Sequence, residues 1–328
     1  MKVLRSRWFL YFLFLVAVIF ILTQWLGWEK DKSAENTLTT DSDSAWVPPT
    51  LDTDPNPQGK ERELLIYGAD LIANTAKYLG PKGSVLHISN GLNCQNCHLD
   101  AGTRTWGNNF GAVAATYPKF RPRSGKVADI VDRINGCFER SMNGQKLDKN
   151  SREMQAMAAY INWIGRSVPK GEKPKGTALE AIPYIDRAAD PQKGQIVFNT
   201  ICQRCHGANG EGTINPDSVS YTYPPLWGPH SYNDGAGLYR LSKFASFVHN
   251  NMPFNEAFHN APKLTLEQAW DVAAFVNSQP RPHKDAGNDW PDISKKPVDH
   301  PFGPYADSFP EQQHKYGPFK PIEAAKKK

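Results

Sequence analysis

The chain is 328 residues long, which is enough for about two domains, and its formal net charge is +5. Its 38 lysines and arginines form no basic stripe, so the composition does not favour a nucleic-acid-binding protein; it suits anionic small molecules or acidic protein partners. The mean hydropathy of −0.55, with 25 glycines and 26 prolines, indicates small domains without a rich aliphatic core.

Residues 1–29 have the pattern of a membrane anchor. Three basic residues precede an uncharged run of 21 residues, 8–28, which is long enough to cross a bilayer and has tryptophans at its ends. The positive-inside rule keeps the basic end cytoplasmic, so the rest of the chain would lie on the periplasmic side of the cytoplasmic membrane. A cleaved signal peptide is the alternative, and the chain would then be periplasmic. It is disfavoured because its apolar part would be shorter and would precede a small-residue cleavage site.

A flexible tether is expected over 30–57, which is rich in Asp, Ser, Thr and Pro. The first domain is expected over 58–170. Apolar residues recur at helical spacing over 64–79, and a second helical pattern runs over 151–167.

A C-x-x-C-H pentapeptide lies between these two helices, and a second copy lies further along the chain. This is the attachment sequence of haem c: each cysteine forms a thioether with the porphyrin, and the adjacent histidine becomes the proximal iron ligand. Two zinc or redox C-x-x-C pairs are the alternative, but the motifs begin 108 residues apart, much further than in a zinc ribbon. The sequence therefore predicts two covalently bound haem c groups. Their attachment residues are Cys94, Cys97 and His98 in the first motif and Cys202, Cys205 and His206 in the second.

The second half of the chain repeats the order of the first. After a linker at 171–189, a second domain is expected over 190–280, with a helical pattern before its motif and another at 265–277. The hexapeptides at 157–162 and 272–277 are similar and lie 115 residues apart. The predicted fold is therefore all-α, with two tandem cytochrome c domains following a single transmembrane helix. The tail, 281–328, contains many aromatic residues and is expected to wrap over the domains as an irregular segment.

The 115-residue offset also indicates the distal iron ligands. Met252 precedes a proline between the second motif and the last helix, which suits a thioether ligand. The same offset places Cys137 at the equivalent position of the first half. A thiolate lowers the potential of an iron and a methionine raises it, so the first haem would be the reactive centre and the second the electron outlet. The alternatives are an inert buried Cys137, or Met142 or Met154 as the ligand.

Positive charge surrounds Cys137 in the sequence. A helix is expected over 126–142, and on it Arg133, Cys137 and Ser141 are spaced four residues apart and share one face. Arginine side chains bind oxyanions with two parallel hydrogen bonds, so this face would hold an anion beside the thiol. The alternative is that these arginines are solvated surface charges.

Two stretches resemble the thiosulfate dehydrogenase family of dihaem cytochromes c. They are residues 132–144, DRINGCFERSMNG, and residues 97–103, CHLDAGT, and the similarity runs from about residue 60 to the tail. The resemblance implies that a His/Cys-ligated first haem is the active site, where two thiosulfates are joined to tetrathionate, in many members reversibly. The residues matching the family's substrate-binding positions are Arg123, Arg133, Ser141 and Gln145. Asn251 departs from the pattern, because some relatives have there a lysine that can bind the second iron.

We therefore expect a thiosulfate dehydrogenase that passes electrons from a His/Cys haem to a His/Met haem and on to a cytochrome c. A membrane-tethered dihaem electron carrier without its own substrate is the alternative. A third possibility is a carrier subunit of a sulfur-oxidising complex whose partner holds the substrate.

Overall fold

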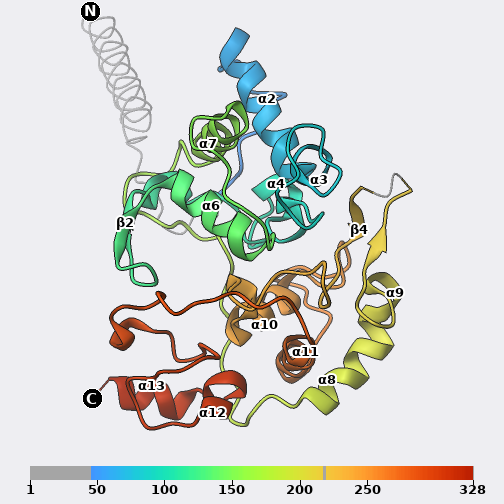
Figure 1. Ribbon diagram of the computed structural model, residues 1–328, viewed down its shortest axis with the longest axis vertical. Coiled ribbons are helices and arrows are strands. Elements are labelled where there is room, and N and C mark those ends of the chain that lie inside the picture. Colours follow the sequence, from blue (N-terminus) through green and yellow to red (C-terminus); the bar gives the residue numbers. More distant parts are fainter. Residues whose placement is uncertain (1–45, 217–218, 328) are drawn as a thin grey trace, which may run out of the picture. The chain divides into compact units, whose positions relative to one another are not determined.

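Two helical bodies, each with its own hydrophobic core, follow one another along the chain (Figure 1). The computed structural model describes residues 46–216 and 219–327, which belong to one compact unit. The predicted anchor, 1–29, and most of the predicted tether, 30–57, lie outside the described residues. In the part that is described, no helix is both long and apolar enough to span a membrane.

The first body surrounds the first C-x-x-C-H motif. Its elements are α2 (Gly59–Ala73), α3 (Thr75–Leu79), the short turns η1 (Cys94–Asn96) and α4 (Leu99–Gly102), α5 (Val113–Thr116), strands β1 (Lys119–Arg121) and β2 (Lys126–Ala128), α6 (Ile130–Arg140) and α7 (Arg152–Ile164). The core between α2 and α7 is made of fully buried side chains such as Leu71, Met154 and Met157.

The second body repeats this order around the second motif. Its elements are α8 (Pro191–Val197), the π-helical turn η2 (Phe198–Cys202), α9 (Gln203–His206), strands β3 (Thr213–Ile214) and β4 (Tyr221–Tyr223), η3 (Gly237–Tyr239), α10 (Leu241–Asn251) and α11 (Leu266–Ser278). Helix α11 opens with a capping box, in which the side chains of Thr265 and Gln268 each accept from the other's backbone N–H.

In each of the two bodies, a glycine lies at the point where two helices cross. In the first, a Cβ on Gly68 of α2 would lie 2.1 Å from the backbone oxygen of Ala156 in α7. In the second, a Cβ on Gly194 of α8 would lie 1.9 Å from the backbone oxygen of Asp271 in α11. Each pair of helices therefore packs backbone to backbone, which any side chain at the glycine would prevent.

The predicted helix over 126–142 is wrong in its first part. Residues 126–128 instead form β2, which pairs antiparallel with β1 in a short hairpin. The helix starts only at Ile130, because Asp129 and Asp132 form a reciprocal capping box: each side chain accepts from the other's backbone N–H. The hairpin and the cap place the basic residues before Asp129 on a separate strand pair beside α6.

The tail packs on the second body and also contacts the first. It contains η4 (Ile293–Lys295), α12 (Glu311–Tyr316) and α13 (Lys320–Lys326). Phe319 and Ile322 are buried in the second core. The backbone N–H of Trp290 donates to the carbonyl oxygen of Arg123 in the first body at 2.7 Å.

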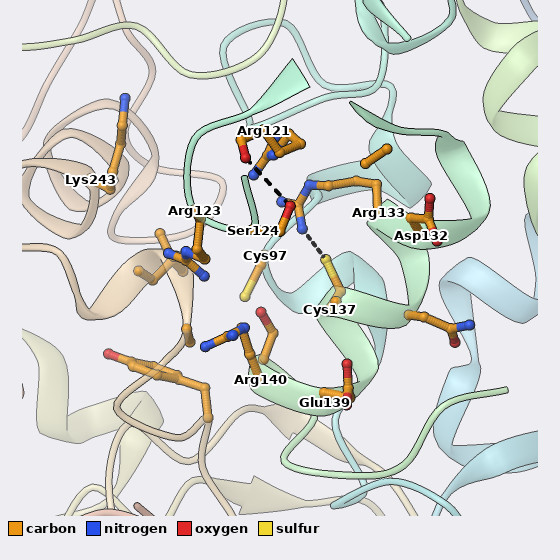
Figure 2. Close-up of a pocket in the computed structure, with 18 of the residues that line it drawn as sticks. Cys97, Arg121, Arg123, Ser124, Asp132, Arg133, Cys137, Glu139, Arg140 and Lys243 are labelled. Carbon is orange, nitrogen blue, oxygen red and sulfur yellow. Dashed lines mark hydrogen bonds between the residues drawn. The ribbon is translucent and has the colours of Figure 1, made fainter. Parts of the chain in front are cut away.

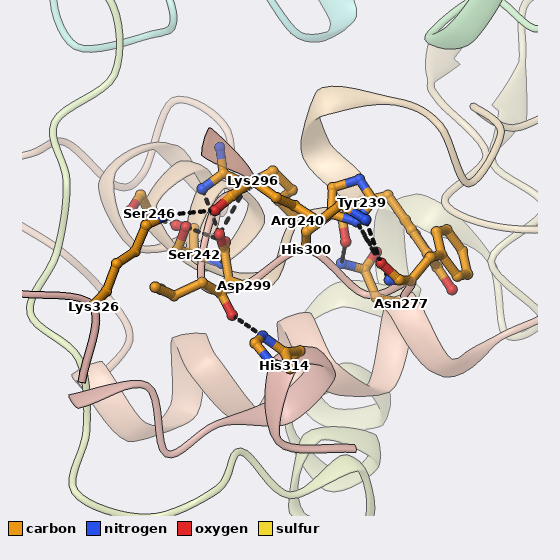
Figure 3. Close-up of polar contacts among 12 residues, drawn as sticks. Tyr239, Arg240, Ser242, Ser246, Asn277, Lys296, Asp299, His300, His314 and Lys326 are labelled. Atoms are coloured by element: carbon orange, nitrogen blue, oxygen red, sulfur yellow. Dashed lines mark hydrogen bonds and ion pairs between the residues drawn. The ribbon is translucent and has the colours of Figure 1, made fainter. Parts of the chain in front are cut away.

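The tail also caps a helix of the second body (Figure 3). Helix α10 has no capping side chain of its own at its N-terminus. Asp299 of the tail fills this role, since one carboxylate oxygen accepts from the backbone N–H of Ser242 at 3.1 Å and the other from Arg240 Nε at 2.9 Å. At its other end, α10 leads directly into Met252.

Candidate active site

The first motif is fixed to the start of α3 by buried hydrogen bonds. The backbone N–H of Cys94 donates to Thr75 Oγ1 at 3.0 Å, and the backbone N–H of Ala76 donates to Asn93 Oδ1 at 2.9 Å. None of the chain's five cysteines, all within the described residues, is paired in a disulfide. Both motif cysteines, Cys94 and Cys97, are therefore free for thioether formation.

Each motif histidine is oriented by a backbone carbonyl. Nδ1 of His98 lies 2.5 Å from the carbonyl oxygen of Asn108, and Nδ1 of His206 lies 2.8 Å from that of Pro224. Such a bond makes Nδ1 the protonated nitrogen and leaves Nε2 with a lone pair, as a metal ligand requires. Both histidines therefore fit the role of proximal iron ligand.

A cavity of about 550 Å³, here called the first apolar cavity, lies beside the first motif. Its walls include Cys94, Cys97, His98 and Cys137 together with core side chains of α6 and α7. The side chains of His98 and Cys137 lie close to each other in this wall. The donor set, the apolar lining and the volume fit a covalently held haem with a histidine and a thiolate as its two axial groups.

A second apolar cavity, of about 370 Å³, surrounds the second motif. It is lined by the second motif and by Met252, and also by Gln95, Asn96 and Cys97 of the first motif. His206 and Met252 on the walls fit a haem with a histidine and a thioether as axial groups. Because the first motif forms part of this wall, the two cofactor sites are neighbours.

Cys137 has the environment of a stabilised thiolate. Its Sγ accepts a hydrogen bond from Arg133 Nη1 at 2.8 Å, across one turn of α6 (Figure 2). Burial by itself would raise the pKa of Cys137, but the charge and the hydrogen bond of Arg133, together with the neighbouring His98, lower that pKa to about 6. By contrast, burial raises the pKa of Cys94 and of Cys97 to about 12.

A third cavity, of about 690 Å³, opens beside Cys137 and is here called the basic cavity. It shares Cys97, His98, Arg133 and Cys137 with the first apolar cavity. The cationic residues in its wall are Arg121, Arg123, Lys126, Arg133, Arg140, Lys146, Arg240 and Lys243, and the acidic ones are Asp132, Glu139 and Asp289. The excess of positive charge makes it a site for anions next to a thiolate.

Comparisons with known proteins agree with this geometry. Residues 86–169 match the model of the SoxA/TsdA cytochrome c domain, and residues 191–280 match that of cytochrome c. A thiosulfate dehydrogenase of Allochromatium vinosum is 34% identical over 230 residues, which cover 69% of this chain and 81% of that protein. The chain belongs to the thiosulfate dehydrogenase family.

Further relatives in the family match over a smaller share of their length. A thiosulfate dehydrogenase of Psychrobacter arcticus is 38% identical over 62% of this chain and 61% of its own. A solved structure of thiosulfate dehydrogenase (TsdBA) from Marichromatium purpuratum matches with a TM-score of 0.66 and 33% identity, covering 73% of this chain and 50% of that one. The predicted pair of cytochrome c domains is confirmed, and each contains one attachment motif, so the chain binds two haem c groups covalently.

Three of the four residues that match the family's substrate-binding positions lie together. Arg123, Arg133 and Ser141 all line the basic cavity. Gln145 does not line it; the residue is exposed, and its backbone N–H donates to the carbonyl oxygen of Ile88 at 2.9 Å. The backbone after α6 therefore turns Gln145 away from the other three.

The two alternative methionines lie elsewhere. Met154 is fully buried in the core between α2 and α7 and lines none of the three cavities, whereas Met142 lines the first apolar cavity only. Cys137 lies at the boundary of the basic and first apolar cavities, where a ligand could meet both an iron and an anion.

Several residues in the wall of the basic cavity were not predicted from the sequence. Arg140 lies in the same helix as Cys137, but its spacing from Cys137 did not identify it as a site residue. Lys243 and Asp289 come from the second body and the tail, more than 100 residues further along the chain. Only an alignment or a structure could have revealed them, because no local pattern connects them to Cys137.

Proposed function

We propose that this protein oxidises two thiosulfates to tetrathionate beside Cys137 and passes the electrons through the second haem to a cytochrome c acceptor. The observation that carries the proposal is the 2.8 Å hydrogen bond from Arg133 to the Cys137 sulfur, opposite His98 and at the edge of a basic cavity. A carrier without a substrate has no need of a thiolate that opens onto an anion site.

Haem bound at the two motifs supplies the acceptor for two electrons. The chain's own residues do the rest. Arg133 holds Cys137 as a thiolate and, with Arg123 and Ser141, binds the sulfonate of the first thiosulfate. The outer sulfur of that thiosulfate bonds to Cys137 Sγ as two electrons leave, which gives Cys–S–S–SO₃⁻.

A second thiosulfate completes the reaction. Its outer sulfur attacks the sulfur that carries the sulfonate, a new S–S bond forms, and the bond to Cys137 breaks. The products are tetrathionate and the free thiolate, with two electrons released per tetrathionate. Arg133 stabilises the thiolate as a leaving group, since it again donates to Sγ. The same steps in reverse would reduce tetrathionate.

The second body serves as the electron outlet in this proposal. The wall shared by the first motif and the second apolar cavity supports direct transfer between the two cofactors. His206 and Met252 would hold the iron of the second haem, and a methionine ligand would raise its potential relative to the first. Electrons would therefore flow toward the second haem and on to a cytochrome c.

The proposed location is the periplasmic side of the cytoplasmic membrane. It rests on the apolar run at 8–28 with its basic flank, and on the attachment of c-type haem outside the cytoplasm. Recovery of the full chain from salt-washed membranes, with its N-terminus intact, is the expected result. A mature N-terminus near residue 30 would instead indicate a cleaved leader.

The function is tested by incubating the purified haem-loaded protein with thiosulfate and ferricyanide or a cytochrome c. We expect tetrathionate at one molecule per two electrons accepted. Cys137→Gly should abolish turnover while both haems remain attached. The control is Arg166→Gln, which should keep turnover, because Arg166 pairs with Asp54 and lines none of the three cavities. Fully loaded wild-type protein that neither consumes thiosulfate nor reduces tetrathionate would instead be an electron carrier.

A further inference from the structure

Arg140 has a buried nitrogen without a protein partner. Its Nη2 donates to Asp289 Oδ1 at 2.8 Å, but Nη1 is fully buried from solvent and makes no hydrogen bond within the described residues. A buried donor left unsatisfied destabilises the folded state. Because Arg140 lines the basic cavity, a bound anion would satisfy Nη1.

Arg123 lies beside Arg140, and both point into the same part of the basic cavity near Cys97 (Figure 2). Burial and the nearby charge of Arg140 together lower the pKa of Arg123 to about 10. The two positively charged guanidinium groups repel each other. Two charges held together in this way favour an anion between them.

A loop of the second body holds this arginine pair in place. Arg123 Nη1 donates to the carbonyl oxygen of Gly235 at 3.1 Å, and a Cβ on Gly235 would lie 2.7 Å from Arg140 Nη1. In the same loop, Asn233 Nδ2 donates to the carbonyl oxygen of Glu139 at 2.9 Å. The backbone N–H of Asn233 donates to the carbonyl oxygen of Arg140 at 3.1 Å. These bonds satisfy carbonyl groups at the end of α6 that have no partner within the helix.

The tail completes the arrangement. Asp289 supplies the carboxylate that orients Arg140, and the next residue, Trp290, bonds the backbone of Arg123. The Trp290 ring also lies 5.8 Å from the guanidinium carbon of Arg123. The pair of arginines is therefore positioned by segments that are remote in sequence from the Cys137 helix.

The chemistry requires a second anion site. Joining two thiosulfates brings two dianions within bonding distance in a partly buried cavity, and their repulsion must be offset by separate cations. Arg133 is engaged with Cys137 and the first sulfonate in the proposed function, on which this inference rests. We propose that Arg140, held by Asp289 and placed beside Arg123, forms the subsite for the sulfonate of the second thiosulfate, and so for one end of tetrathionate.

The test uses oxidised, haem-loaded protein and two measurements. Calorimetric titration with tetrathionate, in a Cys137→Ala background whose missing thiolate cannot attack the ligand, gives a Kd without reaction. Stopped-flow mixing with thiosulfate, without an acceptor, follows reduction of the haems, which in the proposed steps needs only the first thiosulfate. Arg140→Gln should raise the Kd for tetrathionate at least tenfold, and should leave the thiosulfate concentration for half-maximal haem reduction within about twofold. Arg133→Gln should impair both.

A second variant keeps the proposal testable if Arg140→Gln fails to fold. Gly235→Ala keeps every charge but pushes Arg140 Nη1 aside, so it should raise the Kd for tetrathionate severalfold. Arg166→Gln should change neither measurement. An unchanged Kd in Arg140→Gln and Gly235→Ala would overturn the proposal, as would an equal shift in haem reduction. If wild-type protein fails to oxidise thiosulfate, the proposed function falls, whereas the Kd for tetrathionate still reports on the subsite.

Discussion

At the scale of single residues, the site depends on one thiol, Cys137, which lies outside the two attachment motifs. Cys137 is held as a thiolate by Arg133 and faces His98, whereas Cys94 and Cys97 lie in surroundings that disfavour the charged form. The same sulfur would then serve as iron ligand, nucleophile and leaving group. A thiol can combine these roles only where a fixed cation stabilises it, which is what the i, i+4 spacing on α6 provides.

Replacing Arg133 should impair substrate binding. Losing a charge-assisted contact to an oxyanion costs about 1.5–3 kcal/mol, so Arg133→Ala should raise the KM for thiosulfate on the order of tenfold to a hundredfold. Steady-state kinetics with a cytochrome c acceptor measures this, with Arg166→Ala as the control. An unchanged KM would show that Arg133 does not touch the substrate.

The axial ligands can be assigned by spectroscopy. Cys137→Ala should remove the low-spin thiolate signal in electron paramagnetic resonance and change the potential of the first haem only. Met252→Gly should change the higher-potential haem only, because this side chain lines the second apolar cavity. A thiolate signal that survives in Cys137→Ala would refute the assignment.

At the scale of elements, each body depends on a helix crossing that only glycine permits. Gly68 and Gly194 lie where two backbones touch, so the helix carrying the glycine is fixed against the last helix of its body. In the second body the chain then runs directly into the attachment motif, and in the first it continues into α3, whose start is hydrogen-bonded to the motif. The crossing therefore sets the position of the motif relative to the core.

Substitution at the crossings should reduce stability. Gly68→Ala or Gly194→Ala forces a Cβ against a backbone oxygen and should cost about 1–3 kcal/mol or more, lowering Tm by several degrees. Gly136→Ala is the matched control, since it also lies within a helix but a Cβ there meets nothing within 4 Å. Thermal unfolding of the haem-loaded protein would show whether Gly68→Ala and Gly136→Ala differ as expected.

At the scale of the whole molecule, the tail links the two bodies and stabilises both sites. Asp289 and Trp290 hold arginines of the basic cavity, and Asp299 caps the helix that ends at Met252. The sequence analysis predicted an irregular tail. The tail instead contains α12 and α13, and its Phe319 is buried in the second core. Removing the tail would therefore disturb both the anion site and the second cofactor site.

Asp299 should make stability depend on pH. Burial by itself would raise the pKa of Asp299, but Arg240 and Ser242 lower it below its ordinary value of 3.8. The ionised carboxylate therefore contributes full stability above that ordinary value, and the contribution is lost as the pH falls through the lower value of the folded state. Asp299→Ala leaves Arg240 without its partner and should cost about 3–5 kcal/mol at pH 7.

Thermal unfolding between pH 3 and 7 tests this expectation. The Tm difference between wild type and Asp299→Ala should be greatest near neutral pH and should shrink as the medium becomes more acidic than about pH 4. A difference that stays constant across this range would mean that the charge of Asp299 contributes nothing.

The sequence by itself determined the features that depend on neighbouring residues. The two motifs are contiguous, and Arg133 and Cys137 are one helical turn apart, so their 2.8 Å contact follows from helix geometry. The 115-residue repeat likewise matched the order of helices in the two bodies. By contrast, the start of α6 was misplaced because the hairpin before it depends on pairing between strands.

Tertiary structure decided what lies around Cys137. Arg140 and Asp289 are 149 residues apart, and Arg123 and Gly235 are 112 apart, yet each pair is in contact. Gln145, close to Cys137 in the sequence, is turned away by the backbone after α6. Contacts of this kind arise from the packing of whole bodies and leave no periodic pattern in the chain, so only the folded structure reveals them.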